Sequence, residues 1–163
     1  MTRKPFERHL YEKYDASAKD ALLSYLSQEG HTINSVKENY YADVVSTKDT
    51  DDLIYSEAEV KAAWKAGTNW PSDWAEVRIP GRKQRLLNKY SQVTFYVFLE
   101  DCQECWVIES HQMTEDRLRE AKGRYIRAGE KFFHIPVKEA KLIKHEATQW
   151  TEVKEATGSY AAH

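Results

Sequence analysis

The stretch YYADVVSTKDTDDLIYSEAEVK, residues 40–61, contains the features that decide the predicted fold. Two runs rich in β-branched and aromatic residues flank the polar sequence KDTDD, a pattern typical of two antiparallel strands joined by a turn. Successive side chains of a strand point to opposite faces of the sheet. On the second strand, residues 53–64, the even positions are mostly apolar, and Glu57, Glu59 and Lys61 share the other face.

The turn predicts how the two strands are aligned. If the hairpin folds about Thr50, the numbers of opposing residues sum to about 100, so Asp43 faces Glu57 directly and Glu59 diagonally. Diagonal neighbours in a sheet are about 7–8 Å apart, close enough for two carboxylates to reach one cation. A shift of one residue would turn Asp43 to the other face, so the alignment is open to test.

This acidic group predicts a metal site. Two adjacent carboxylates raise each other's pKa unless a cation lies between them. Mg²⁺ favours one or two carboxylates together with water and phosphate oxygens, and it can acidify a bound water. We therefore predict that Asp43 and Glu59 bind Mg²⁺, with Mn²⁺ as a substitute. Lys61 could then hold the attacking water or stabilise charge on a transferring phosphate, which fits phosphodiester hydrolysis.

A charged outer sheet face is the alternative interpretation. The Glu-x-Lys pattern also occurs at Glu120–Lys122, Glu139–Lys141 and Glu152–Lys154, where it is typical of solvated surface. Only the copy at Glu59 has an apolar opposite face, an aspartate on the preceding strand and a helix after it.

The remaining pattern predicts a mixed α/β or α+β fold, in which a meander of antiparallel strands is followed by a helical crossover. Helices are expected at 17–29, 81–90 and 114–128, strands at 31–36, 40–47, 53–64, 93–101, 105–110 and 131–143, and a loop at 65–80. We expect one domain over residues 1–145 and a polar, partly flexible segment over 146–163.

Composition narrows the functional class. The chain has 163 residues and a net charge of −2, so no global basic signature of a nucleic-acid binder is present. No apolar window is long enough for a membrane span, and the N-terminus lacks a secretory signal, so we expect a cytoplasmic, intracellular protein with no membrane partner. Cys102 and Cys105 are expected to be plain thiols at a hairpin turn, with a redox pair or half of a zinc site as alternatives.

The sequences YADVV and EAEVK, in this order, resemble the PD-(D/E)XK nuclease superfamily, which includes restriction endonucleases and Holliday junction resolvases. The resemblance covers about half of the chain, residues 17–100, and implies a restriction-endonuclease-like core of helix, three-stranded meander, helix and strand. An added hairpin, helix and strand follow this core. The chain departs from the family pattern in two ways: Ala42 precedes Asp43 in place of a proline, and the hairpin is long.

The resemblance implies a Mg²⁺-dependent DNA endonuclease in repair, recombination, restriction or phage DNA processing. Asp43 and Glu59 would ligate the metal together with the Val60 carbonyl, and Lys61 would assist the nucleophilic water. The family often adds an acid from the first helix, for which Glu29 is the candidate; an exposed carboxylate is the alternative. Glu57 is either a second metal ligand or an acid behind the ligands. A homodimer is one option, since similar enzymes often pair to cut two strands.

A basic segment follows the predicted active strand, which suits binding of a DNA backbone. Its members are Arg78, Arg82, Lys83, Gln84, Arg85 and Lys89. A helix with a solvated basic side is the alternative. Trp70 and Trp74 in the preceding loop could stack on bases, although tryptophans in such loops more often fill the core. Two other functions stay open: a non-catalytic binding domain on a nuclease-like fold, and a structural protein with a charged sheet face.

Overall fold

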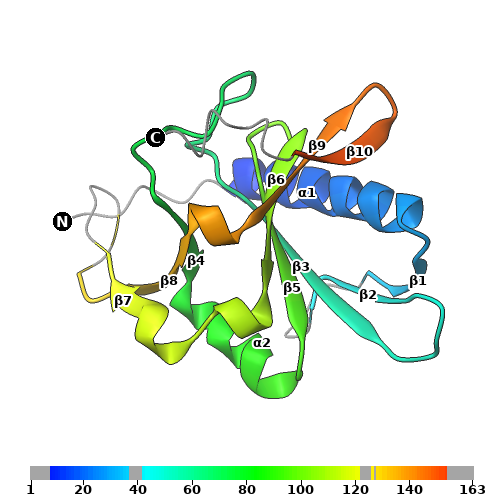
Figure 1. Cartoon of the computed structure of the whole chain (residues 1–163), viewed down its shortest axis with the longest axis horizontal. Coiled ribbons are helices and arrows are strands. Elements are labelled where there is room, and N and C mark those ends of the chain that lie inside the picture. The colour runs from blue at the N-terminus through cyan, green and yellow to red at the C-terminus, as the bar shows by residue number, and fades with distance from the viewer. Residues whose placement is uncertain (1–7, 37–41, 122–125, 127, 154–163) are drawn as a thin grey trace.

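The computed structural model describes residues 8–36, 42–121, 126 and 128–153, with side chains from residue 16 onward. It is a mixed α/β structure with two sheets and two α-helices among these residues. The large sheet has the spatial order β1-β2-β3-β5-β6-β9-β10 (Figure 1). Its strands are β1 (Thr32–Ser35), β2 (Val44–Thr47), β3 (Ile54–Val60), β5 (Val93–Phe98), β6 (Glu104–Glu109), β9 (Lys141–Glu146) and β10 (Gln149–Val153).

The centre of the large sheet contains its one parallel pair among the described strands. β1, β2 and β3 form an antiparallel meander, and β5 then lies beside β3 in the parallel direction. A parallel neighbour requires a crossover, and this one passes through β4 (Glu76–Pro80) and α2 (Gln84–Lys89). The near-continuous apolar sequence of β5 follows from its position, because almost all of its side chains are buried on both faces of the sheet.

The helix α1 (Arg8–Gln28) covers one face of the large sheet. Ala18, Leu22 and Leu26 recur at a spacing of four residues and are at most 1 % exposed. They pack with Val44 of β2 and Ala58 of β3, so the even positions of β3 face the helix as predicted. Burying the Leu22 side chain alone contributes about 1.5–3 kcal/mol.

The ends of α1 differ in how well the sequence predicts them. Gly30 has a φ of 88°, the left-handed conformation that commonly ends a helix, and the predicted stop is confirmed. The predicted start is wrong, because Ser17 lies inside the helix and does not cap it. The helix therefore begins nine residues before the first residue of the predicted segment.

The opposite face of the large sheet packs against the second sheet and α2 (Figure 1). This sheet has the order β4-β8-β7, with β7 at Leu118–Glu120 and β8 at Lys131–Pro136. Val77 and Ile79 of β4 are fully buried and meet Phe95 and Val97 of β5 in one apolar cluster. Leu86 anchors α2 to the same cluster.

Four tryptophan rings join this cluster. Trp64 lies 5.2 Å from Trp70 and 6.4 Å from Trp106, and Trp70 lies 5.0 Å from Trp74 and 5.7 Å from Trp106, centroid to centroid. Edge-to-face contacts dominate, as the aromatic quadrupole favours. The loop tryptophans 70 and 74 thus fill and clamp the core, which was the favoured interpretation.

Several other predicted elements are wrong. Residues 114–128 do not form a helix: a 3₁₀ turn at Glu115–Arg117 leads directly into β7, and 122–125 and 127 lie outside the described residues. The predicted strand at 131–143 is two strands, β8 and β9, in different sheets. The predicted loop at 65–80 contains β4.

The C-terminal segment also differs from the prediction. Residues 149–153 form β10, which pairs with β9 along its whole length. Trp150 is 4 % exposed and packs against Tyr25 of α1. The segment predicted to be loose from residue 146 thus contributes a strand and a core residue up to Val153, and 154–163 lie outside the described residues.

The predicted hairpin of Cys102 and Cys105 is confirmed. Both cysteines are free thiols and buried; Cys102 lies in the turn between β5 and β6, and Cys105 is the second residue of β6. Cys102 adopts a φ of 60°, which the tight turn requires. Burial raises the pKa of the Cys102 thiol to about 11, so this thiol stays protonated and unreactive at neutral pH.

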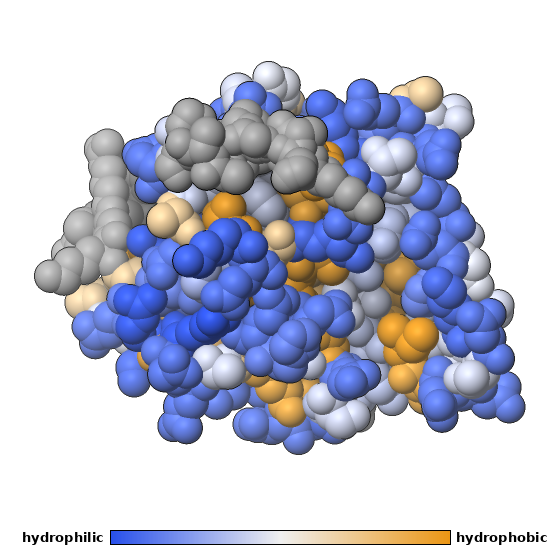
Figure 2. Space-filling model, in the orientation of Figure 1, coloured by the Kyte–Doolittle hydropathy of each residue, from blue (hydrophilic) through white to orange (hydrophobic). Residues whose placement is uncertain are grey.

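The described residues present a mainly hydrophilic face in the view of Figure 2, with small apolar patches between polar side chains. Among the described helices, none combines the length and apolar character that a membrane crossing requires.

Candidate functional site

The alignment of β2 and β3 positions the acidic residues. Val44 pairs with Ser56, Val45 with Tyr55 and Ser46 with Ile54, so the numbers of paired residues sum to 100 as predicted. Pairing stops at Val44, and one residue further the backbone N–H of Asp43 donates instead to Oε2 of Glu57, at 2.9 Å. The Glu57 side chain therefore takes the place of the next strand-to-strand hydrogen bond, where the pairing of β2 with β3 ends.

The carboxylate of Asp43 lies along the edge of β3. Its Oδ2 accepts a hydrogen bond of 3.0 Å from the backbone N–H of Ala58, and its Oδ1 lies 3.8 Å from Nζ of Lys19 on α1. Asp43 is 8 % exposed. Burial, and next the charge of Glu57, raises the pKa of Asp43 to about 6, although the Ala58 hydrogen bond and nearby lysines oppose the rise.

Glu57 and Glu59 point away from α1, toward the second sheet. They pair with Phe95 and Val97, which belong to the cluster on that side. The Glu57 side chain is only 4 % exposed, whereas that of Glu59 is 22 % exposed. Burial of Glu57 contradicts a solvated outer sheet face, the alternative interpretation of this strand.

A lysine joins these two glutamates. Nζ of Lys83 lies 2.7 Å from Oε1 of Glu57 and 3.3 Å from Oε1 of Glu59. Burial lowers the pKa of Lys83, but the charges of Glu59 and Glu57 and their hydrogen bonds outweigh it, so the pKa is raised overall. The ammonium is therefore charged at neutral pH. Arg82 reaches the same region from solvent, with Nη2 at 3.7 Å from Glu59.

The turn after β4 carries Lys83 to this position. Residues Gly81–Lys83 form a 3₁₀ turn that continues into α2, where fully buried Leu86 fixes the helix. A Cβ on Gly81 would come within 2.8 Å of the Lys131 carbonyl oxygen, so only glycine allows β8 to approach this closely. Lys83 is 8 % exposed, which removes it from the predicted DNA-contacting surface.

Lys61 is the first residue after β3, and its contacts differ from those of Lys83. Its backbone N–H donates to the Phe98 carbonyl at 2.8 Å, and its Nζ lies 5.1 Å from the centre of the Trp74 ring. Burial, and next the positive charge of Arg78, lowers the pKa of Lys61. Val60, whose carbonyl was predicted as a metal ligand, is the last residue of β3, and that role stays a prediction.

The structure does not bring Glu29 to the acidic group. Glu29 is exposed beyond the C-terminal end of α1, ten residues after Lys19, which contacts Asp43. With a rise of 1.5 Å per residue, this separation is about 15 Å along the axis. The candidate acid from the first helix therefore stays an exposed carboxylate, the alternative given for it.

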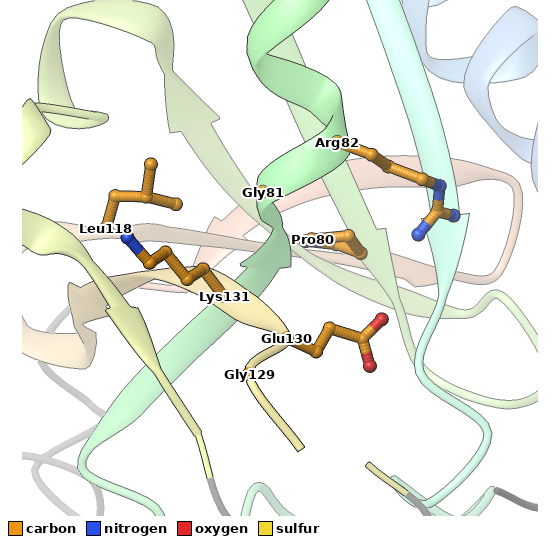
Figure 3. Close-up of a pocket in the computed structure, with 7 residues that line it drawn as sticks. All are labelled: Pro80, Gly81, Arg82, Leu118, Gly129, Glu130 and Lys131. Atoms are coloured by element: carbon orange, nitrogen blue, oxygen red, sulfur yellow. The ribbon is translucent and has the colours of Figure 1, made fainter. Parts of the chain in front are cut away.

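The other members of the basic segment are exposed: Arg78, Arg82, Gln84, Arg85 and Lys89. Arg82 also borders an open pocket of about 340 Å³ (Figure 3). The pocket is lined by Pro80, Gly81, Arg82, Leu118, Gly129, Glu130 and Lys131. In this view the side chain of Arg82 extends away from Gly81 and from the turn. Arg82 thus both borders the pocket and approaches Glu59.

Asp43 and Glu59 are the two carboxylates predicted to hold a divalent cation. Within the described residues, no group of three or more His, Cys, Asp or Glu side chains is placed to hold a metal. Asp43 and Glu59 would supply two carboxylates, and Mg²⁺ commonly takes its remaining ligands from water and phosphate. A cation, the Lys83 ammonium, already lies against Glu59.

Sequence reasoning missed the parts played by Lys19 and Lys83. Lys19 lies on the polar side of a helix among many charged residues, and nothing in the pattern marks it. Lys83 was assigned to the basic segment, and the signal that could have separated it is its position three residues before buried Leu86.

Comparison with known proteins found no matching family model, no matching curated protein and no matching solved structure.

Proposed function

We propose that this protein is a Mg²⁺-dependent DNA endonuclease of the PD-(D/E)XK type. The observation that carries the proposal is the contact of Asp43 with β3, where its backbone donates to Glu57 and its carboxylate accepts from Ala58, the residue before Glu59. The succession of α1, the β1–β3 meander, α2 and a strand parallel to β3 also supports it, because this order is the restriction-endonuclease-like core that the sequence resemblance implies.

In this proposal Asp43 and Glu59 hold the metal, and Mn²⁺ can replace Mg²⁺. The bound ion would acidify a water and polarise the scissile phosphate. Glu57 acts behind the ligands, since its oxygens accept from the Asp43 backbone and from Lys83. Lys61 stays the predicted partner of the nucleophilic water.

The exposed cations would bind the polymer. Arg78, Arg82, Arg85 and Lys89 lie on β4, on the turn that follows it and on α2, and Arg82 approaches Glu59. Such residues neutralise phosphates and make binding fall with rising salt. We therefore expect DNA to cross this side of the molecule, with its backbone against Arg82.

A non-catalytic DNA-binding domain is the second candidate function. One observation favours it: the Lys83 ammonium forms ion pairs with both Glu57 and Glu59. A site closed in this way would keep the basic surface and the fold but would not hydrolyse DNA.

Cleavage assays separate the two functions. Branched, duplex and single-stranded DNA should be incubated with the full chain in Mg²⁺ or Mn²⁺. We expect cleavage of at least one substrate, and its loss in Asp43→Asn and Glu59→Gln by about 10²-fold or more, because each removes a carboxylate that the metal needs. Asp51→Asn, on the exposed turn of the same hairpin, is the matched control and should cut like the parent. Cleavage that survives in both site variants would refute the proposal.

A further inference from the structure

Lys83 contributes a buried charge to the acidic group. It comes from the crossover between β3 and β5, 26 residues after Glu57 in sequence, and its side chain is 10 % exposed. Burying an ammonium is costly unless it is paired and hydrogen-bonded. The crossover is therefore shaped so that one cation occupies the space between two glutamates.

The two glutamates hold Lys83 unequally. Glu57 is the closer partner, at 2.7 Å against 3.3 Å for Glu59. Glu57 also has its second oxygen bonded to the Asp43 backbone, and its side chain is 4 % exposed. Glu59 is the more distant and more accessible partner, at 22 % exposure. An ion arriving from solvent would therefore meet Glu59 first.

We propose that Lys83 is a built-in competitor for the cation position, and that a divalent metal reaches Glu59 only by displacing the Lys83 ammonium. The ammonium then stays on Glu57, so the buried charge keeps a partner. The inference rests on the metal site of the proposed function and assigns its regulation: occupancy is limited by the protein's own lysine. It also assigns Glu57 as a positioning residue that holds Lys83 and the Asp43 backbone.

Metal affinity tests this competition without any nuclease assay. Mn²⁺ binding to the full chain should be followed by isothermal titration calorimetry for the parent and for Lys83→Met, which keeps the length of the side chain and removes its charge. We expect Lys83→Met to bind Mn²⁺ at least about tenfold more tightly, because a repelling unit charge is lost within a few ångströms of the ion. Lys138→Met, which removes an exposed lysine elsewhere, controls for net charge and should match the parent.

A second substitution locates the effect. Adding Glu59→Gln to Lys83→Met should abolish the gain in affinity, because the carboxylate for which the metal and Lys83 compete is then absent. Equal or weaker Mn²⁺ binding by Lys83→Met would overturn the inference, and so would a gain that survives Glu59→Gln.

A measurement on the parent protein covers the case in which Lys83→Met does not fold. In ¹⁵N-lysine-labelled protein, Mg²⁺ should shift the side-chain ammonium signal of Lys83 and leave that of Lys138 unchanged. An unchanged Lys83 signal at saturating Mg²⁺ would overturn the inference.

The failures of the two proposals can be told apart. Tighter Mn²⁺ binding by Lys83→Met with no cleavage of any DNA would refute the nuclease alone. Cleavage that depends on Asp43 and Glu59, combined with equal Mn²⁺ affinities, would refute the competition alone.

Discussion

Replacing Asp43 by asparagine is expected to stabilise the fold at neutral and alkaline pH. Asp43 is 8 % exposed, and burial together with the neighbouring charge of Glu57 disfavours its ionised form. Asparagine is nearly the same size, and its side-chain oxygen can still accept from the Ala58 N–H. The substitution therefore removes an unfavourable charge and keeps the local geometry.

The magnitude follows from the pKa. Folding raises the pKa of Asp43 from 3.8 to about 6, which is about two pK units, and one unit corresponds to about 1.4 kcal/mol. The folded state thus binds the proton more tightly than the unfolded state. Its free energy of unfolding falls as pH rises from about 4 to about 6, and the loss is complete above that range. Ionised Asp43 therefore costs at most about 3 kcal/mol, and this figure already includes the attraction to Lys19 that asparagine gives up.

Chemical denaturation at two pH values measures this effect. At about pH 8, Asp43→Asn should raise the free energy of unfolding by about 1–3 kcal/mol, and at about pH 4 the gain should vanish because Asp43 is then protonated in the folded state. Asp51→Asn, on the exposed hairpin turn, should change stability little at either pH. If Asp43→Asn destabilises the protein at pH 8, or gains equally at both pH values, the reasoning about burial is wrong.

Two further substitutions test the packing. Trp150→Ala should cost about 3–5 kcal/mol in chemical denaturation, because Trp150 is 4 % exposed and meets Tyr25 edge-on; Thr151→Ala, its exposed neighbour, should cost about 0.5 kcal/mol or less. A cost below about 1 kcal/mol would mean that β10 is not part of the core. Gly81→Ala should lower the melting temperature by an amount equivalent to about 1–3 kcal/mol, because its Cβ would meet the Lys131 carbonyl at 2.8 Å. An unchanged melting temperature would show that the close approach of β8 is not a constraint.

The sequence predicts the elements whose signals are local. The polar turn and the alternation around it predict the β2–β3 alignment correctly. The apolar spacing in α1 and the continuous apolar run of β5 likewise correctly predict which of their residues are buried. Each of these depends on contacts within a few residues or on one buried face.

The sequence pattern does not predict elements that are fixed by residues distant in the chain. Residues 114–128 have good helix formers, but Leu118 pairs with Phe133 of β8, and this tertiary contact overrides the propensity. β10 is short and mostly polar, and a single residue, Trp150, fixes it to α1. In both cases the residues that fix the element lie far away in the sequence, so the local pattern gives no sign of them.

The acidic residues and Lys83 likewise differ in how far the sequence predicts their positions. One hairpin brings Asp43 into contact with Glu57, and the alternation of strand residues predicts this contact; a shared site with Glu59 stays a prediction. Lys83 arrives through a 3₁₀ turn whose direction is set by β4 and β8. Its pairing with the glutamates is therefore a property of the crossover and not of any motif.

The tryptophan cluster gives the molecule an intrinsic optical probe. Each of the rings of Trp64, Trp70, Trp74 and Trp106 lies 5.0–6.4 Å from another ring of the set, which is close enough for excitation energy to pass between them. The Lys61 ammonium lies over the Trp74 ring at one side of this set. Any ligand that draws Lys61 away changes the electric field at an indole, and the unlabelled protein thereby reports events at the end of β3 through its own fluorescence.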